Sequence, residues 1–148
     1  MSTQADIFRG LHAGPDLLIL PNAWDAGSAR VIETLGARAV ATSSAAVCWS
    51  HGYADGHHLP ISLLAQTVAE ITRIVSIPVT CDSEGGYADE PAAVGENIAR
   101  IIDAGAVGIN IEDGLDAPDL LAAKIEAVRK AADRAGVALF INARTDVY

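Results

Sequence analysis

Five short runs of β-branched and aliphatic residues alternate with longer segments of helical period, and this alternation limits the folds that the chain can adopt. The pattern predicts strands at about residues 17–22, 38–43, 77–82, 107–112 and 138–143. It predicts helices at about residues 3–13, 26–36, 61–75, 90–104 and 118–135. No hairpin signal joins the strands, so an α/β fold with a parallel sheet is expected. An open doubly wound sheet and a shortened barrel both satisfy this pattern.

The punctuation between the segments supports these boundaries. A glycine follows a helical run and precedes a strand at three places, where a left-handed C-cap is expected, namely Gly36, Gly105 and Gly136. Ser62 and Asp119 stand near predicted helix starts, where a side-chain oxygen can cap free amides.

Composition and charge exclude several classes of function. The 148 residues suit one domain, and the formal net charge of −9 disfavours nucleic acid or an anionic membrane surface as a partner. No apolar run approaches the ~20 residues of a membrane span, and no secretory signal opens the chain. Cys48 and Cys81 are interpreted as reduced, buried thiols without a nucleophilic role, which fits a cytoplasmic protein.

Acidic residues collect where the predicted strands end. In parallel α/β folds the active site lies beyond the carboxyl ends of the strands. Asp82 and Glu84 follow the third strand, and two residues of such spacing point the same way if the segment is extended. Glu112 ends the fourth strand, and Asp55 lies on the long loop that follows the second strand. Four converging carboxylates would repel one another, and a hard cation such as Mg²⁺ relieves that repulsion.

The same ends carry groups suited to an anion. Arg144 follows the fifth strand, and its planar fork fits a carboxylate or phosphonate. The small residues Ser43, Ser44 and Ala45 follow the second strand, where backbone amides and hydroxyls can approach an anion. Each acid alone is more simply a cap or a solvated loop group, but the joint pattern indicates a metal-dependent anion site.

Other polar residues near these ends receive simpler interpretations. Solvated loop positions are expected for three histidines, His51, His57 and His58. Asp113 and Asp146 are expected to be loop or capping groups. Asn142 either orients Arg144 or faces the interior, and Trp24 either covers the pocket or packs at the rim.

Four segments in this order make the sequence similar to a known family. They are residues 20–29 (LPNAWDAGSA), 82–87 (DSEGGY), 110–114 (NIEDG) and 141–146 (INARTD). Together they resemble the isocitrate lyase/phosphoenolpyruvate mutase family, over nearly the whole chain. The resemblance implies a (β/α)₈ barrel of the TIM type, here truncated after about five β/α units.

The resemblance also implies a chemistry and a set of roles. The family uses Mg²⁺ to break or form C–C or P–C bonds beside a 2-oxo or 2-hydroxy acid, through a metal-bound enolate. By resemblance Asp82 binds the metal directly, and Asp55, Glu84 and Glu112 hold its water molecules. Ser43, Ser44 and Ala45 line the anion pocket. Arg144 binds the substrate carboxylate and is the catalytic residue that steadies developing negative charge. A C–C lyase is the first expectation, and phosphonate P–C chemistry at the same site is the alternative.

Several departures from the family narrow these expectations. Residues 115–118 (LDAP) stand where the isocitrate and methylisocitrate lyases carry a Lys-Arg-Cys-Gly-His loop, so those two substrates are disfavoured. The lysine and asparagine of the phosphonomutase gating loop are also not evident. The family's commoner Asp-x-Asp appears as Asp82-Ser83-Glu84, which resembles a less characterised branch.

The length departs from the family as well. A complete barrel usually needs roughly 250 residues. Residues 1–148 are therefore expected to be the N-terminal part of a single barrel domain, forming a homo-oligomer at full length. A five-strand piece would expose open edges, which invites association.

Two functions of other classes compete with the enzyme. A phosphoacceptor signalling domain would place an acidic pair after the first strand and a lysine after the fifth. Here those places hold residues 21–23 (PNA) and 142–144 (NAR), which disfavours it. A truncated barrel that binds metal or a partner without turnover stays open, and turnover by the 148-residue chain would exclude it.

Overall fold

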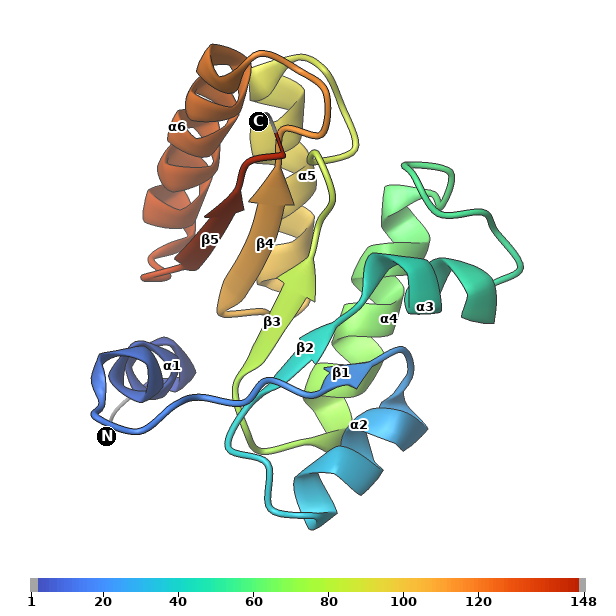
Figure 1. Cartoon of the computed structure of the whole chain (residues 1–148), viewed down its shortest axis with the longest axis vertical. Helices are drawn as coiled ribbons and strands as arrows, with labels where there is room; N and C mark the ends of the chain where they lie inside the picture. Colours follow the sequence, from blue (N-terminus) through green and yellow to red (C-terminus); the bar gives the residue numbers. More distant parts are fainter. Residues whose placement is uncertain (1–2, 147–148) are drawn as a thin grey trace.

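The computed structural model describes residues 3–146 and shows alternating helices and parallel strands (Figure 1). The strands are β1 (Asn22–Ala23), β2 (Val40–Thr42), β3 (Val79–Asp82), β4 (Gly108–Glu112) and β5 (Phe140–Arg144). The helices are α1 (Gln4–Ala13), α2 (Ala26–Thr34), α3 (Ser44–Ser50), α4 (Ile61–Ile74), α5 (Pro91–Asp103) and α6 (Pro118–Ala135).

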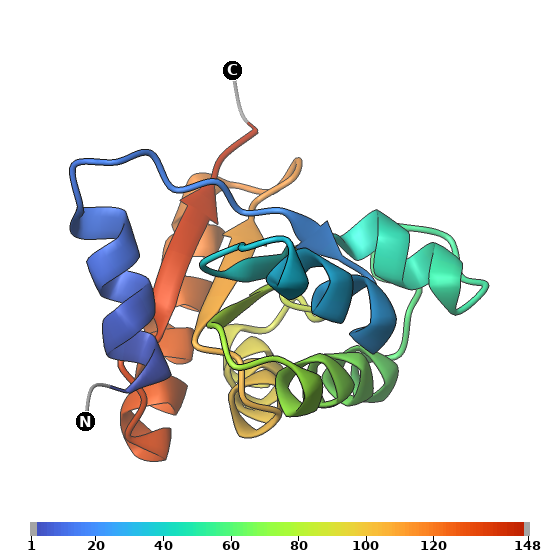
Figure 2. The same cartoon turned by 90° about the horizontal axis from the view of Figure 1, so that it is seen from below.

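The order of the strands decides between the two architectures. All neighbouring pairs are parallel, and the sheet runs β1-β2-β3-β4-β5 in the order of the sequence. A doubly wound sheet reverses its order at a switch point, whereas successive barrel strands are added in one direction. Figure 2 shows the sheet curving, with α2, α4, α5 and α6 around its outer side. These features confirm the barrel-type fold expected from the sequence.

Side chains alternate between the two faces of the sheet, as strand geometry requires. Cys81, Ile109 and Ile111 are fully buried in the main core, which also contains residues of α4, α5 and α6. Thr80, Asn110 and Asn142 line a hollow of about 230 Å³ on the other face. The inner face is therefore polar in its middle, and the outer face forms the hydrophobic core.

Helix α1 packs against the sheet near the amino ends of β4 and β5. The buried ring of Phe8 meets Phe140 edge to face, with 5.4 Å between the ring centroids. A Cβ at Gly108 would lie 2.7 Å from the Phe8 ring, so only glycine permits this contact. Helix α1 does not cover the opposite, carboxyl ends of these strands, where the polar residues lie.

Two elements differ from the sequence prediction. The first strand was expected at 17–22, but its ladder begins only at Asn22. Pro21 has no amide to donate, and its carbonyl accepts from the Ala41 amide at 3.0 Å. The segment after β2 was expected to be a loop, yet α3 occupies residues 44–50, with the Ser43 side chain accepting from the Ala46 amide.

The predicted ends of the helices are confirmed in part. The left-handed glycines are present, with φ of 91° at Gly36, 100° at Gly105 and 68° at Gly136. The predicted caps at Ser62 and Asp119 are wrong, because α4 and α6 begin after Pro60 and Ala117 without a side-chain cap. Among residues 3–146, no helix combines the length and apolar character needed to cross a membrane.

Candidate metal and carboxylate site

Strand register brings three predicted site residues to one edge of the inner face. Asp82 lies opposite Asn110 in the β3–β4 pair, and Glu112 lies opposite Arg144 in the β4–β5 pair. Because side chains alternate, these three residues share the face that Thr80, Asn110 and Asn142 line. They extend that face at the carboxyl ends of the strands, where barrel active sites form.

Asp82 is held by the end of β2 and the start of α3. Its amide donates to Thr42 Oγ1 at 2.9 Å, and its Oδ2 accepts from the Ser44 amide at 3.0 Å. The second oxygen, Oδ1, has only a long contact of 3.4 Å from the Glu84 amide. The carboxylate is thus oriented by the backbone while retaining free acceptor capacity.

Glu84 lies on a turn rather than on an extended strand. Its φ is +49°, so the expectation that Asp82 and Glu84 project alike from an extended segment is wrong. The residue is only 5 % exposed, and the amide of His57 donates to Oε2 at 2.6 Å. The hydroxyl of Tyr87 donates to Oε1 at 2.6 Å. Burial, and then this bond to Glu84, raise the pKa of Tyr87 far above its usual value.

Asp55 reaches the same site from the loop that follows α3. Single ligand atoms of Asp55, Glu84 and Cys48 lie within 4.8 Å of one another. Burial first, then Glu84 and Asp55, raise the pKa of the Cys48 thiol. The thiol therefore stays protonated, which leaves the oxygen atoms as the better ligands here.

Glu112 pairs with Arg144 across the last two strands. The Arg144 Nη1 lies 2.7 Å from Glu112 Oε2, and Arg144 Nη2 lies 2.8 Å from Asp146 Oδ2. Burial raises the pKa of Glu112 and Arg144 opposes that rise, while Asp82, Asp146 and Glu84 add to it. The pKa of Glu112 remains raised because burial, with the neighbouring acids adding to it, outweighs the opposing effect of Arg144.

The charge of this site fits a bound divalent cation. Within residues 3–146, no lysine or arginine nitrogen lies within 4.0 Å of the carboxylates of Asp55, Asp82 or Glu84. Glu84 is buried, whereas Asp82 is half-buried and Asp55 is exposed. A buried carboxylate with further acids nearby is unfavourable without a positive partner. Oxygen ligands with room for water are what Mg²⁺ prefers. The residues present therefore suit such an ion.

Other predicted groups have defined places. Asn142 donates to Asn110 Oδ1 at 2.9 Å and lines the inner hollow, so it faces the interior. Asp113 is a loop group, since it accepts from the Thr145 hydroxyl at 2.7 Å and the Asp146 amide at 2.9 Å. Trp24 is partly exposed at the end of β1.

The cysteines are buried and free, as expected. Burial raises the pKa of Cys81 to about 12.

Two residues that support the Glu84 turn were given no role in the site from the sequence. His57 was expected to be a solvated loop group, but its Nε2 accepts from the Gly85 amide at 2.8 Å. Tyr87 was not assigned a role, although it binds Glu84. His51, also expected to be solvated, contacts Thr67 Oγ1 at 2.8 Å. The contact of His57 with the Gly85 amide depends on a fold that no local sequence pattern specifies.

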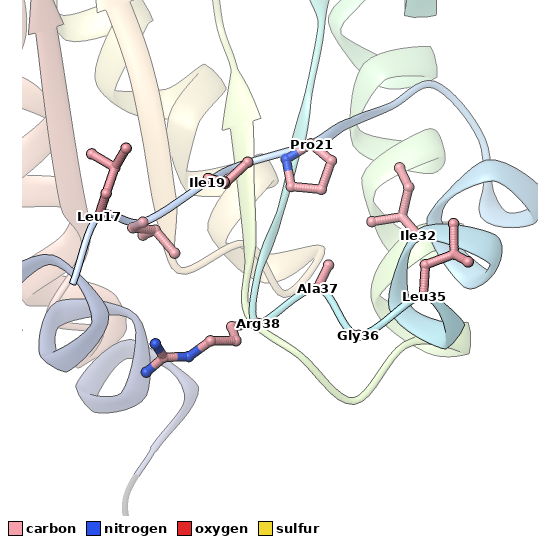
Figure 3. Close-up of a pocket in the computed structure, with 9 residues that line it drawn as sticks. Leu17, Ile19, Pro21, Ile32, Leu35, Gly36, Ala37 and Arg38 are labelled. Carbon is pink, nitrogen blue, oxygen red and sulfur yellow. The ribbon is translucent and has the colours of Figure 1, made fainter.

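A separate apolar hollow of about 390 Å³ lies at the other end of the sheet (Figure 3). It is lined by residues that precede β1 and β2 together with residues of α2 and its C-terminus, including Leu17, Ile19, Ile32 and Leu35. Arg38 is the only ionisable residue among those that line it in the described chain. The hollow therefore lacks the convergent polar groups of a catalytic site.

The fold is of the barrel type, and acidic residues lie at the carboxyl ends of β3 and β4. The family model described as phosphoenolpyruvate phosphomutase matches residues 8–148, and the chain belongs to this family. The match confirms the isocitrate lyase/phosphoenolpyruvate mutase resemblance seen in the sequence.

Individual relatives agree with this assignment. The uncharacterized protein Rv1998c of Mycobacterium tuberculosis is 38% identical over 95% of this chain and 53% of its own length. A putative phosphonomutase from Burkholderia cenocepacia has 47% identity and a TM-score of 0.94, over 98% of this chain and 61% of that chain. A 2,3-dimethylmalate lyase, titled a member of the PEP mutase/isocitrate lyase superfamily, has 28% identity and a TM-score of 0.87, over 99% and 54%. The chain spans about half the length of the curated relatives it matches.

Proposed function

We propose that the chain forms the metal- and anion-binding part of a Mg²⁺-dependent lyase that cleaves a C–C bond in a small 2-oxo or 2-hydroxy carboxylate. Residues 1–148 would be the N-terminal part of one barrel domain. The proposal rests on three observations: Asp82 and Glu112 end β3 and β4 on the inner face, Glu112 pairs with Arg144, and ligand oxygens of Asp55 and Glu84 lie within 4.8 Å of each other. Within residues 3–146, no lysine or arginine pairs with Asp55, Asp82 or Glu84.

Each acid has a role that its surroundings support. Asp82, with one little-used oxygen, would be the direct Mg²⁺ ligand. Asp55, Glu84 and Glu112 would hold the water molecules that Mg²⁺ retains. When bound, the ion would supply electrophilic stabilisation of negative charge on substrate oxygens.

Arg144 would bind the substrate carboxylate and act as the catalytic electrophile of the chain itself. Its side chain is half-exposed, and Glu112 and Asp146 fix its direction. A guanidinium oriented before substrate arrives stabilises developing charge at little reorganisation cost. Ser43, Ser44 and Ala45 would line the neighbouring anion pocket, where their small side chains leave space beside Asp82.

No thiol of this chain is proposed as the general acid, because both cysteines are buried with raised pKa values. The loop after β4, where Leu115 is 99 % exposed, contains no cysteine. The proposal therefore favours substrates other than isocitrate and methylisocitrate.

Phosphonate P–C chemistry at the same site is the second candidate. It is supported by the 47% identity to the putative phosphonomutase. Arg144 and the metal could bind either substrate, because a planar carboxylate and a tetrahedral phosphonate both present negatively charged oxygens. A truncated, non-catalytic barrel is the remaining alternative.

We propose a cytoplasmic protein that acts on a small anion and forms a homo-oligomer at full length. The net charge of −9 supports the absence of nucleic acid and membrane partners.

The test is release of a 2-oxo acid from a panel of 2-hydroxy and 2-oxo dicarboxylates and of 3-carbon phosphonates, with Mg²⁺ or with EDTA. Mg²⁺-dependent cleavage that Asp82→Asn abolishes would support the lyase. The matched control is Asp133→Asn, an exposed acid on α6, which should cleave normally. Turnover of phosphonates alone would favour the second candidate. Cleavage that is unchanged in EDTA would contradict the metal-dependent mechanism.

A further inference from the structure

Lys124 is a buried lysine that none of the roles above uses. It lies on α6 and is only 3 % exposed, although lysine is almost never buried without a partner. Its Nζ donates to the Gly85 carbonyl at 3.0 Å and lies 3.9 Å from Asp116 Oδ2. The side chain thus runs from an outer helix to the turn that carries Glu84.

This turn has a backbone that needs external support. Glu84 and Tyr87 have φ of +49° and +58°, a region that residues with a side chain rarely adopt. Gly86 has φ of +90°. Such conformations persist only where the surroundings hold them. Since Glu84 and Tyr87 both contribute to the acidic site, the support of the turn affects the site directly.

The carbonyls of this turn are held from two outer helices. Lys124 of α6 binds the Gly85 carbonyl, and Asn97 Nδ2 of α5 binds those of Gly86 and Tyr87, both at 3.2 Å. The turn also makes hydrogen bonds among its own residues, to Asp82 of β3, to β4 and to His57.

The two helices are themselves fixed closely to each other. A Cβ at Gly95 of α5 would lie 3.1 Å from the Ala127 carbonyl of α6, so the backbones approach tightly. Ala127 is less than one turn from Lys124. The position of Nζ is therefore set by a packed helix pair rather than by a mobile side chain.

We infer that Lys124 is a positioning residue that holds the Gly85 carbonyl and so aims the Glu84 carboxylate at the metal site. The effect on metal binding rests on the proposed function, whereas the effect on the turn does not. Removal of a group that orients a metal ligand typically weakens affinity about 10–100-fold.

The experiment compares Lys124→Met with Lys130→Met, an exposed lysine of the same helix that pairs with Glu126. Hydrogen exchange of the metal-free chain is measured first. Lys124→Met should raise the exchange rate at the amides of residues 83–87 by at least ten times the change seen at the amides of β3 and β4. Lys130→Met should leave it unchanged, and Lys124→Arg should restore most of the protection by keeping a donor.

Mn²⁺ affinity is then measured by electron paramagnetic resonance at a temperature where every variant is folded. The inference expects weaker binding in Lys124→Met and near-normal binding in Lys124→Arg. Unchanged exchange at residues 83–87 in Lys124→Met would overturn it, as would local loosening with wild-type Mn²⁺ affinity. A wild-type chain that binds no Mn²⁺ would refute the proposed metal site, and the exchange result would still decide whether Lys124 holds the turn.

Discussion

Gly86→Ala should destabilise the chain for two reasons, the positive φ of this residue and a steric contact of the new methyl group with Val94. The residue has φ of +90°, and left-handed backbone costs a residue with a Cβ about 1–2 kcal/mol. An added Cβ would also lie 2.5 Å from Val94 Cγ1 in the core. Overpacking of this kind costs about 1–3 kcal/mol. The expected loss is therefore about 2–5 kcal/mol of unfolding free energy.

Gly36→Ala separates the two parts. Gly36 has φ of +91°, yet nothing lies within 4 Å of its ideal Cβ. This variant should lose only the backbone contribution, and the reduced entropy of the unfolded chain is the same for both glycines. The difference between the two variants then measures the contact with Val94.

The assay is urea unfolding monitored by circular dichroism. Val94→Ala and the double variant Gly86→Ala/Val94→Ala complete a double-mutant cycle. Val94→Ala alone should cost about 1–3 kcal/mol, because it leaves a cavity in the core. The double variant should lose about 1–2 kcal/mol less than additivity predicts, since the smaller side chain makes room for the new methyl group. A Gly86→Ala loss no greater than that of Gly36→Ala, with additive effects, would refute the packing argument.

Three further predictions concern the site. Glu112→Gln should raise the stability of the metal-free chain at pH 7, because burial raises the pKa of Glu112 and ionisation then opposes folding. In the wild-type chain, protonated Glu112 stabilises the fold fully below the ordinary pKa of glutamate, and this stabilisation is lost as pH rises through the raised pKa of the folded state. The stability gain of Glu112→Gln should therefore vanish near pH 4. Calorimetry that shows Glu112→Gln to be less stable than wild type at pH 7 would contradict this. Arg144→Met should abolish stabilisation by oxalate while Mg²⁺ still binds, and titration calorimetry showing normal oxalate binding would remove Arg144 from the anion site. Cys48 and Cys81 should react with a thiol reagent only after unfolding, and fast labelling of the native chain would contradict their burial.

The fold was largely predictable because the sequence features that specify its helices and strands are local. Hydrophobic runs and left-handed glycines such as Gly105 mark the parallel α/β units without reference to the rest of the chain. The choice between barrel and open sheet needed the strand order, which periodicity does not contain. Helix α3 was missed because small residues dominate its start, and Ser43 reads equally well as a loop residue or a cap.

The candidate site was predictable only at the level of residue type. Acids at successive strand ends indicated a shared edge of the sheet, and Asp82 and Glu112 do end the neighbouring strands β3 and β4. The turn at Glu84 was not predictable, because a positive φ at a glutamate depends on contacts from distant segments. His57 and Lys124, which provide two of these contacts, lie 27 and 40 residues from Glu84 along the chain.

Thermal unfolding with Mg²⁺ and oxalate, a stable mimic of a pyruvate enolate, is the most direct test of the proposed metal site. Ligand at a hundred times its dissociation constant adds about 2.7 kcal/mol, or about 5–11 °C in Tm for a chain of this size. We predict a rise of this order that needs both ligands, is lost in Asp82→Ala and is kept in Asp133→Asn. A cooperative transition of the wild-type chain that is unchanged by Mg²⁺ and oxalate together would contradict it.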